Sequence, residues 1–144
     1  MRIIIATLTI INKPYAQLFY HEETGIVHHH LTAELNSANL KEVFFAGNEL
    51  LRKHHATKWL SDNRFMQAHA EEDADWIGNQ WLPQAIEFGW KYWALVVPQT
   101  WHARNNLVDY VNLFHDMGVR VMVFTEVDPA MAWLLKIDKQ PAKR

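Results

Sequence analysis

Three polar residues of different chemistry, Asp62, Asn63 and Arg64, directly follow the short apolar segment 58–61, KWLS. A carboxylate, an amide and a guanidinium at the end of a buried strand could bind a polar ligand or a protein partner. They could equally stabilise the chain itself, with Asp62 capping backbone N–H groups and Arg64 pairing with Glu71, Glu72 or Asp62. The residues alone leave both interpretations open.

The place of these residues at a strand end indicates where a site would form. In open α/β sheets, ligands and partners bind beyond the carboxyl ends of the strands. We expect the start of the second helix and the segment after the central strand to reach the same edge of the sheet. The predicted interaction or ligand surface comprises Asp62, Asn63, Arg64, Asp75, Trp76, Gln99, Thr100 and Trp101.

The histidine run at 28–30 has the composition of a metal-binding tract. On a strand, however, His28 and His30 face one side and His29 faces the other. Only two of them could share an ion, and a third ligand such as His21 would have to come from a paired strand. We therefore predict surface or half-buried histidines, and neither a metal nor a cofactor.

Seven tryptophans give the chain a high aromatic content. Each indole can bury on the order of 200 Å², and the default role of such residues is the hydrophobic core. A chain of this length cannot hide every ring and its N–H, so we expect some to line a groove or a subunit contact, where tryptophan is enriched. The cluster that we expect around the second helix, the central strand and the last helix comprises Trp76, Trp81, Trp90, Trp93, Trp101 and Trp133.

Several classes of function lack their sequence signals. There is no G-x-S-x-G motif, and the five glycines do not form a phosphate-binding loop. The absence of cysteine excludes disulfides, thiolate zinc sites and a cysteine nucleophile. A net charge of −2 argues against a general nucleic-acid binder. We predict no catalytic residues.

The N-terminal segment 1–14 is rich in β-branched residues and predicts an extra strand. Thr7 and Thr9 interrupt its apolar stretch and no A-x-A cleavage site follows, so we do not interpret it as a signal peptide. No apolar run approaches the roughly 20 residues that a membrane span needs. We expect a soluble, cytoplasmic protein in which this strand pairs within the sheet or across a homodimer interface, because a free edge promotes aggregation.

Hydrophobic periodicity predicts a single domain, residues 1–144, in which strands and helices alternate. Residues 17–32 are typical of two strands around a tight turn that ends at Gly25, and we expect positive φ at this glycine. Ser37 or Asn39 can cap the first helix, and Pro83 must kink or split the second. The other expected strands lie at 57–61, 91–98 and 119–124. The expected helices lie at 37–55, 104–117 and 128–137, and the second helix should begin at Asp73 or Asp75 and run to Phe88. A flexible basic tail is expected at 138–144.

This order predicts an α/β fold with a mixed, mostly parallel sheet of about five strands covered by about four helices. The segments KWLS, YWALVV and VMVF should run side by side in one direction. The order, together with the segments YHEETGIVHHHL, KWLSDNR, DWIGNQWLPQAIEFGWKYWALVVP and FTEVDPAMAWL, resembles the STAS domain, the SpoIIAA-like fold of bacterial anti-sigma-factor antagonists. The closer resemblance is to a group of small bacterial STAS-like proteins without an assigned biochemical role.

In the antagonists, the strand that corresponds to KWLS leads into an Asp-Ser-Ser-Gly-type turn in which a partner kinase phosphorylates a serine. Asp62 matches the aspartate of that turn, but Asn63 stands at the serine position and cannot accept phosphate. The resemblance therefore implies a non-catalytic regulatory or protein-interaction module that lacks the usual phosphorylatable serine.

Three hypotheses from different classes follow. The first is an interaction module that binds a protein partner or a second copy of itself through the loop after KWLS and the face of the second helix. The second is a binding protein that holds a small apolar, lipid-like ligand in a pocket between helices and sheet. Ligand pockets need an aromatic lining with a few polar groups, which this chain can supply. The third is an enzyme that uses Asp62, Arg64 and a nearby histidine.

Overall fold

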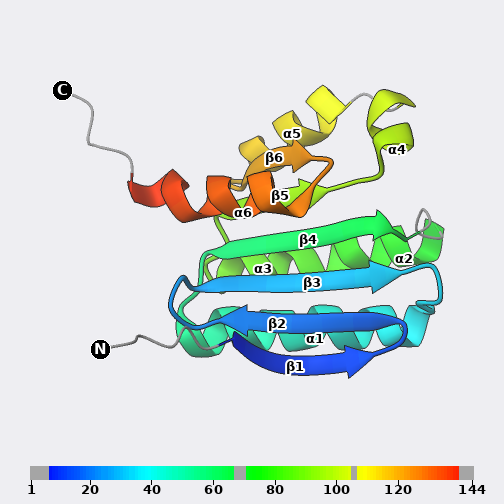
Figure 1. Cartoon of the computed structure of the whole chain (residues 1–144), viewed down its shortest axis with the longest axis horizontal. Coiled ribbons are helices and arrows are strands. Elements are labelled where there is room, and N and C mark those ends of the chain that lie inside the picture. The colour runs from blue at the N-terminus through cyan, green and yellow to red at the C-terminus, as the bar shows by residue number, and fades with distance from the viewer. Residues whose placement is uncertain (1–6, 67–70, 105–106, 140–144) are drawn as a thin grey trace.

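The computed structural model describes residues 7–66, 71–104 and 107–139, and the side chains of 102–104 and 107–110 are not described. The centre of the fold is a six-stranded sheet in the order β1-β2-β3-β4-β5-β6 (Figure 1). Its strands are β1 (Thr7–Lys13), β2 (Ala16–His21), β3 (Ile26–Thr32), β4 (Lys58–Phe65), β5 (Tyr92–Val96) and β6 (Arg120–Phe124).

The sheet is mixed. β1, β2 and β3 pair antiparallel, whereas β3, β4, β5 and β6 pair parallel. The predicted common direction of β4, β5 and β6 is thus confirmed. The sixth strand is β1, which realises the extra N-terminal strand that the sequence predicts and pairs with β2 inside the sheet. Residues 1–6 of that segment lie outside the described residues.

The turn between β2 and β3 fixes which side each histidine faces. Gly25 has φ +71°, as the sequence predicts, and its N–H donates to the carbonyl of His21 at 2.8 Å. In the resulting register His28 lies opposite Phe19 and His29 lies opposite Leu18. Because side chains alternate along a strand, His29 points into the core while its two neighbours point to the other face.

Helices cover the two faces of the sheet unequally (Figure 1). One face carries α1 (Ser37–His54), the helix at 71–87 and α5 (Leu107–Asp116). The other carries α6 (Val127–Lys136), which packs on β4, β5 and β6. A short helix that the sequence did not predict, α4 (Gln99–Arg104), follows β5.

The helix at 71–87 contains a π-helical segment. It consists of α2 (Glu71–Trp76), η1 (Ile77–Trp81) and α3 (Leu82–Glu87). Pro83 has no N–H for the carbonyl four residues earlier, and the N–H of Leu82 instead donates five residues back to Ile77. The predicted split at Pro83 is thus realised as a change of helix type just before it. The helix begins at Glu71 rather than at Asp73 or Asp75.

Other element ends also differ from prediction. Asn36, not Ser37 or Asn39, caps α1, because its side chain accepts the N–H of Asn39 at 2.8 Å. The last helix begins at Val127, so Asp128 lies in its first turn. Residues Ile137–Lys139 form the 3-10 helix η2 and do not belong to a flexible tail, while residues 140–144 lie outside the described part of the chain.

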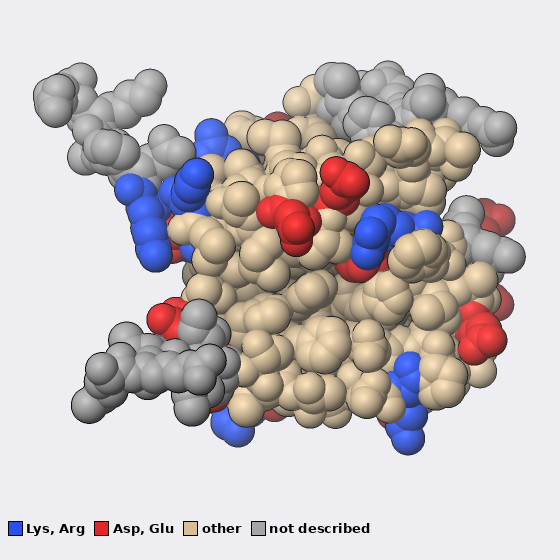
Figure 2. Space-filling view, in the orientation of Figure 1, with Lys and Arg blue, Asp and Glu red and all other residues tan. Residues whose placement is uncertain are grey.

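On the face of the sheet that carries α6, the part over β2 and β3 is not covered by this helix and remains open. We call this part the open face. In Figure 2 the corresponding part of the surface shows few acidic or basic residues. Three half-buried histidines, His21, His28 and His30, lie on this face together with Phe19. The opposite face holds the larger core, to which six of the seven tryptophans belong: Trp59, Trp81, Trp90 and Trp93 are buried, and Trp76 and Trp101 are partly buried.

Candidate functional site

Strand β4 places the predicted polar residues on two different surfaces. It continues to Phe65, so Asp62, Asn63 and Arg64 lie within the strand and do not follow it, which corrects the prediction. The reason is that β4 has a neighbour on each side: Asp62 lies in register with His30 of β3 and Val96 of β5. Alternation then turns Asp62 and Arg64 to the open face and Asn63 to the helix-covered face.

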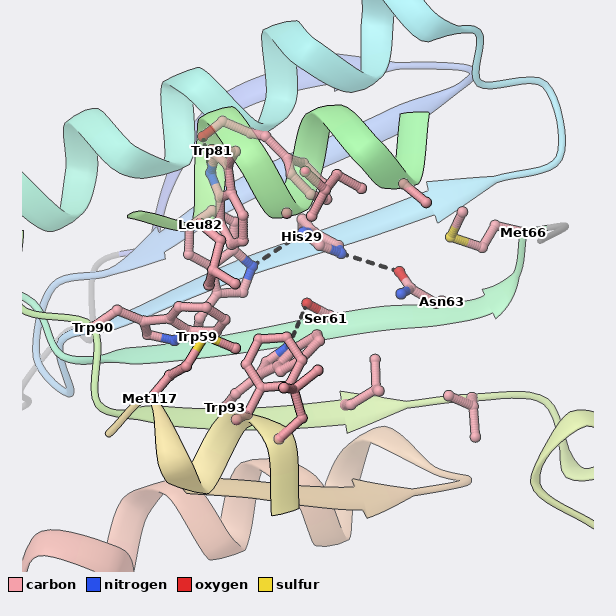
Figure 3. A pocket seen from close by; sticks show the side chains of 18 of the residues that line it. His29, Trp59, Ser61, Asn63, Met66, Trp81, Leu82, Trp90, Trp93 and Met117 are labelled. Atoms are coloured by element: carbon pink, nitrogen blue, oxygen red, sulfur yellow. Dashed lines mark hydrogen bonds between the residues drawn. The ribbon is translucent and has the colours of Figure 1, made fainter. Parts of the chain in front are cut away.

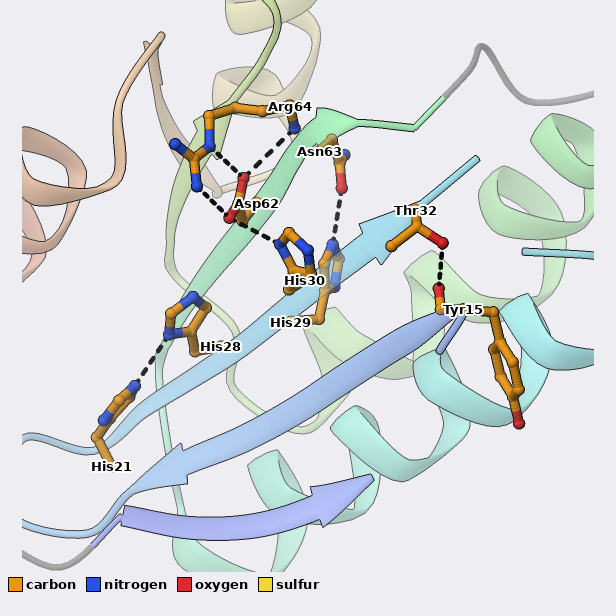
Figure 4. Close-up of polar contacts among 9 residues, drawn as sticks. All are labelled: Tyr15, His21, His28, His29, His30, Thr32, Asp62, Asn63 and Arg64. Carbon is orange, nitrogen blue, oxygen red and sulfur yellow. Dashed lines mark hydrogen bonds and ion pairs between the residues drawn. The ribbon is translucent and has the colours of Figure 1, made fainter. Parts of the chain in front are cut away.

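Asp62 is the centre of a closed polar cluster on the open face (Figure 4). It is 3% exposed, and the guanidinium of Arg64 donates to both of its carboxylate oxygens at 2.9 Å. The ring of His30 binds the same carboxylate through Nδ1 at 2.9 Å. Burial raises the pKa of Asp62, but the hydrogen bonds from Arg64 and His30 outweigh burial and lower the pKa on balance. Arg64 thus pairs with Asp62, one of the contacts that the stabilising interpretation expects.

A second pair of rings lies beside this cluster. His21 Nε2 and His28 Nδ1 are 3.0 Å apart, and the Oγ1 of Thr7 lies 3.2 Å from His21 Nδ1. Burial is the main cause that lowers the pKa of His28 to about 4 and also lowers that of His21. Among the described residues no three His, Asp or Glu side chains come together in a group that could hold a metal ion.

The other predicted site residues do not join Asp62. Asp75 is exposed on α2, and Trp76 packs against Phe45 with a ring-centroid distance of 5.2 Å. Gln99 and Thr100 are exposed at the start of α4. Of the eight residues, Asp62 and Arg64 pair with each other, and only Asn63 and Trp101 line a cavity on the helix-covered face.

This cavity lies on the face of the sheet that also holds the larger hydrophobic core. Its volume is about 410 Å³, and it lies between the sheet, the helix at 71–87 and α5 (Figure 3). Its lining comprises His29, Phe44, Trp59, Ser61, Asn63, Met66, Ala74, Ile77, Gly78, Trp81, Leu82, Trp90, Trp93, Leu95, Val97, Pro98, Trp101, Leu113, Phe114 and Met117.

The sequence builds this cavity from aromatic residues on adjacent strands. Trp59 and Trp93 lie in register on β4 and β5, and Trp81 and Trp90 contact Trp59 from the following elements at ring-centroid distances of 5.3 and 6.1 Å. Gly47 lets α1 approach, since a methyl group there would overlap the ring of Trp59. Large rigid rings fill volume unevenly and leave space between them.

The entrance lies toward the carboxyl ends of the parallel strands. Met66 and Pro98 of the lining follow β4 and β5, and three lining residues, Ala74, Gly78 and Leu113, are exposed. Gly78 belongs to the π-helical segment, and such segments occur often at functional sites. One end of the cavity thus lies at the edge of the sheet at which α/β folds bind their ligands, while Trp90 and Met117, which precede β5 and β6, line its other end.

Three polar side chains interrupt the apolar wall, all on the sheet (Figure 3). The indole N–H of Trp59 donates to Nδ1 of His29 at 3.0 Å, and Nε2 of His29 lies 3.1 Å from Oδ1 of Asn63. The indole N–H of Trp93 donates to Oγ of Ser61 at 2.8 Å. An apolar cavity with a few fixed polar groups has the composition of a small-molecule site.

The residues at the centre of the cavity were missed by the sequence analysis. Trp59 was not assigned to the tryptophan cluster, and His29 and Ser61 were not assigned to a site. Alternation within 58–65 could have identified Trp59 and Ser61, since they share one face of the strand with Asn63. Trp76 and Trp133 were assigned to the cluster but lie outside the cavity, and Trp133 packs on Phe124 across the sheet.

No protein-family model, no curated protein and no solved structure matches the chain. Its class therefore follows from the geometry alone: an α/β domain with a six-stranded mixed sheet and an aromatic cavity beneath its helices. None of the helices within the described residues is both long and apolar enough to cross a membrane.

Proposed function

We propose that the protein binds a small, largely apolar ligand in the tryptophan-lined cavity. The observation that carries this proposal is the cavity itself: about 410 Å³, with a wall made almost entirely of aromatic and aliphatic side chains. Ligand pockets commonly enclose roughly 300–1,000 Å³ with such a lining. An apolar cavity of roughly 150 Å³ already holds benzene. A ligand of two or three fused rings, or a comparable hydrocarbon chain, is the appropriate size.

The tryptophans provide a direct test. Titration with naphthalene should quench the fluorescence of the indoles around the cavity and raise the melting temperature in proportion to its concentration. If a saturated solution of naphthalene produces neither of these two responses, ligand binding is refuted.

A variant can close the entrance without disturbing the fold. A Cβ atom at Gly78 meets nothing within 4 Å, so Gly78→Leu can extend over the cavity mouth. We expect naphthalene to bind at least about tenfold more weakly to this variant. The matched control is Asn79→Leu, which adds a similar side chain to the neighbouring exposed position outside the lining. Equal affinity of the two variants would place the binding elsewhere.

Protein interaction is a second candidate function, in line with the resemblance to STAS regulatory modules. It is favoured by an exposed aromatic pair on the outer surface of α1 and α2. Phe45 is 49% exposed, it contacts Trp76 edge to face, and Lys41 Nζ lies 5.5 Å from the Trp76 ring centroid. Aromatic residues are enriched at protein interfaces. Loss of partner binding in Phe45→Ser, with no loss in Met122→Ser at an exposed apolar residue outside both the cavity and this surface, would support this function.

Self-association through β1 remains part of this second proposal. β1 is an edge strand, and Leu8 and Ile10 on it are 37% and 43% exposed. Edge strands with such side chains pair with a second copy unless they are protected. Sedimentation of wild-type protein and of Ile10→Lys tests this: a dimer that the charge converts to a monomer supports pairing, and a wild-type monomer contradicts it.

A further inference from the structure

The hydrogen bonds under the cavity determine where the proton of His29 lies. An indole N–H can only donate, so Nδ1 of His29, which receives the Trp59 N–H, carries no proton. The neutral imidazole then holds its proton on Nε2 and donates it to Oδ1 of Asn63. This assignment also fixes the amide of Asn63, whose oxygen faces the histidine and whose nitrogen therefore faces away from it.

Two hydrogen-bond donors remain at the cavity wall as a consequence. The amide nitrogen of Asn63 has two N–H groups, for which the described residues supply no hydrogen-bond acceptor. Ser61 accepts the N–H of Trp93 through Oγ and keeps its own hydroxyl proton as a donor. Both residues line the cavity, and they lie two positions apart on the same face of β4.

The electrostatic character of the wall is neutral. Among the residues described as lining the cavity there is no Lys, Arg, Asp or Glu. The charged residues of β4 nearest to Asn63, Asp62 and Arg64, lie on the other face and neutralise each other. A charged ligand group would therefore lose its hydration at this wall without gaining a counter-charge, which is costly.

We propose that the ligand is neutral and carries a carbonyl-type hydrogen-bond acceptor on an aromatic or hydrocarbon body. This inference rests on the proposed function and adds the chemical class of the ligand. The acceptor oxygen receives hydrogen bonds from Ser61 and Asn63, while the body packs among Trp59, Trp93 and Phe114. Ketones, aldehydes and quinones belong to this class. Carboxylates and amines do not.

Four probes of nearly equal size separate the possibilities in the full-length wild-type protein. 2-Acetylnaphthalene carries a neutral acceptor, 2-ethylnaphthalene has none, 2-naphthoate is an anion and 2-(aminoethyl)naphthalene is a cation at pH 7. Dissociation constants come from tryptophan quenching and are checked by calorimetry. We expect 2-acetylnaphthalene to bind at least about fivefold more tightly than 2-ethylnaphthalene, the ratio that one net hydrogen bond gives, and both charged probes to bind more weakly than either.

The outcomes distinguish this inference from the proposed function. If all four probes bind alike, or if 2-ethylnaphthalene binds as tightly as 2-acetylnaphthalene, the cavity binds ligands but the inferred acceptor is wrong. Tightest binding of 2-naphthoate or of the amine would also overturn the inference, because it would require a charged partner at the wall. If none of the probes binds, the proposed function itself fails.

Two variants test the donors separately. Ser61→Ala and Asn63→Leu should each reduce the ratio between the acetyl and ethyl probes toward one, while binding of 2-ethylnaphthalene persists. Because the ratio is measured within a single variant, a general loss of stability does not change it. Asn79→Leu is the control and should keep the wild-type ratio. An unchanged ratio in both Ser61→Ala and Asn63→Leu would contradict the assignment of the donors.

Discussion

The indole of Trp59 and the imidazole of His29 form a buried hydrogen bond of 3.0 Å between two neighbouring parallel strands. His29 is 2% exposed and Trp59 is 1% exposed. This bond orients the ring of Trp59 under the cavity. It also sets the direction of the next hydrogen bond, from His29 to Asn63. A histidine in this position is a structural part of the cavity floor.

Substitution of His29 should separate its hydrogen bonds from its volume. His29→Leu leaves the N–H of Trp59 and the oxygen of Asn63 without this partner, and an unsatisfied buried group costs about 1–3 kcal/mol. We expect a loss of about 2–4 kcal/mol in the free energy of unfolding, measured by urea denaturation. His29→Gln can supply one acceptor and one donor, so it should lose less. Equal losses in the two variants would show that the hydrogen bonds are unimportant.

Gly47 should be intolerant of even a methyl group. A Cβ atom there would overlap the Trp59 ring, whereas a Cβ atom at Gly78 meets nothing within 4 Å. Overpacking of a core costs about 1–3 kcal/mol, and alanine in a helix recovers up to about 1 kcal/mol relative to glycine. We expect Gly47→Ala to lower the melting temperature by several degrees and Gly78→Ala to leave it unchanged or raise it. A stable Gly47→Ala protein would mean that α1 does not approach Trp59 this closely.

The histidine pair on the open face should make stability depend on pH. The pKa of His28 is about 4 in the folded protein, below the ordinary value of 6.5, so the unfolded chain binds the proton first as the pH falls. Its contribution is therefore constant above pH 6.5 and is lost between pH 6.5 and pH 4. The difference between the folded and ordinary pKa of His28 corresponds to about 3 kcal/mol in the free energy of unfolding. The lowered pKa of His21 acts in the same direction.

Denaturation curves between pH 4 and pH 7 can measure this effect. The slope of unfolding free energy against pH should be smaller in His28→Gln than in the wild type, because the replaced side chain does not titrate. His115→Gln, which changes an exposed histidine on α5, is the control and should retain the wild-type slope. Superimposable slopes for wild type and His28→Gln would contradict the burial of His28.

Lys58 and Asp138 should respond asymmetrically to mutation. Lys58 is 4% exposed, and its Nζ donates to Oδ1 of Asp138 at 2.8 Å, which lowers the pKa of that carboxyl group. Asp138→Ala leaves a buried ammonium without its partner and should cost about 1–3 kcal/mol, less than a fully buried pair because Asp138 itself is partly exposed. Lys58→Met removes the charge and keeps the chain length, so thermal denaturation should show a smaller loss. If Lys58→Met loses more stability than Asp138→Ala, this pair is not a stabilising contact between η2 and β4.

Much of the fold could be predicted because its signals are local. The alternation on either side of Gly25 and the interruption of the second helix at Pro83 depend on neighbours in the sequence. The end of β4 could not be predicted in this way. Asp62 and Arg64 have the polarity of a loop, and only His30, 32 positions earlier, together with the neighbouring strands makes their burial within the sheet favourable.

The site was predicted only in part for a related reason. Asn63 and Trp101 were identified, but assigning Asp62–Arg64 to one loop concealed the alternation that sends Asn63 to the cavity and its neighbours to the open face. Trp59 was likewise left out of the predicted tryptophan cluster, since nothing local distinguishes a ring that fills the core from a ring that borders a cavity. That distinction depends on Gly47 and on the π-helical segment, both distant from Trp59 in the sequence.

The most direct test of the central claim is diffraction from crystals grown with 1-bromonaphthalene, because bromine gives an anomalous signal that locates the ligand without bias. We expect one dominant bromine peak inside the cavity, among Trp59, Trp93 and Met117. This peak should be absent in Gly78→Leu crystals. Peaks confined to the outer surface, or an empty cavity in crystals saturated with the compound, would contradict it.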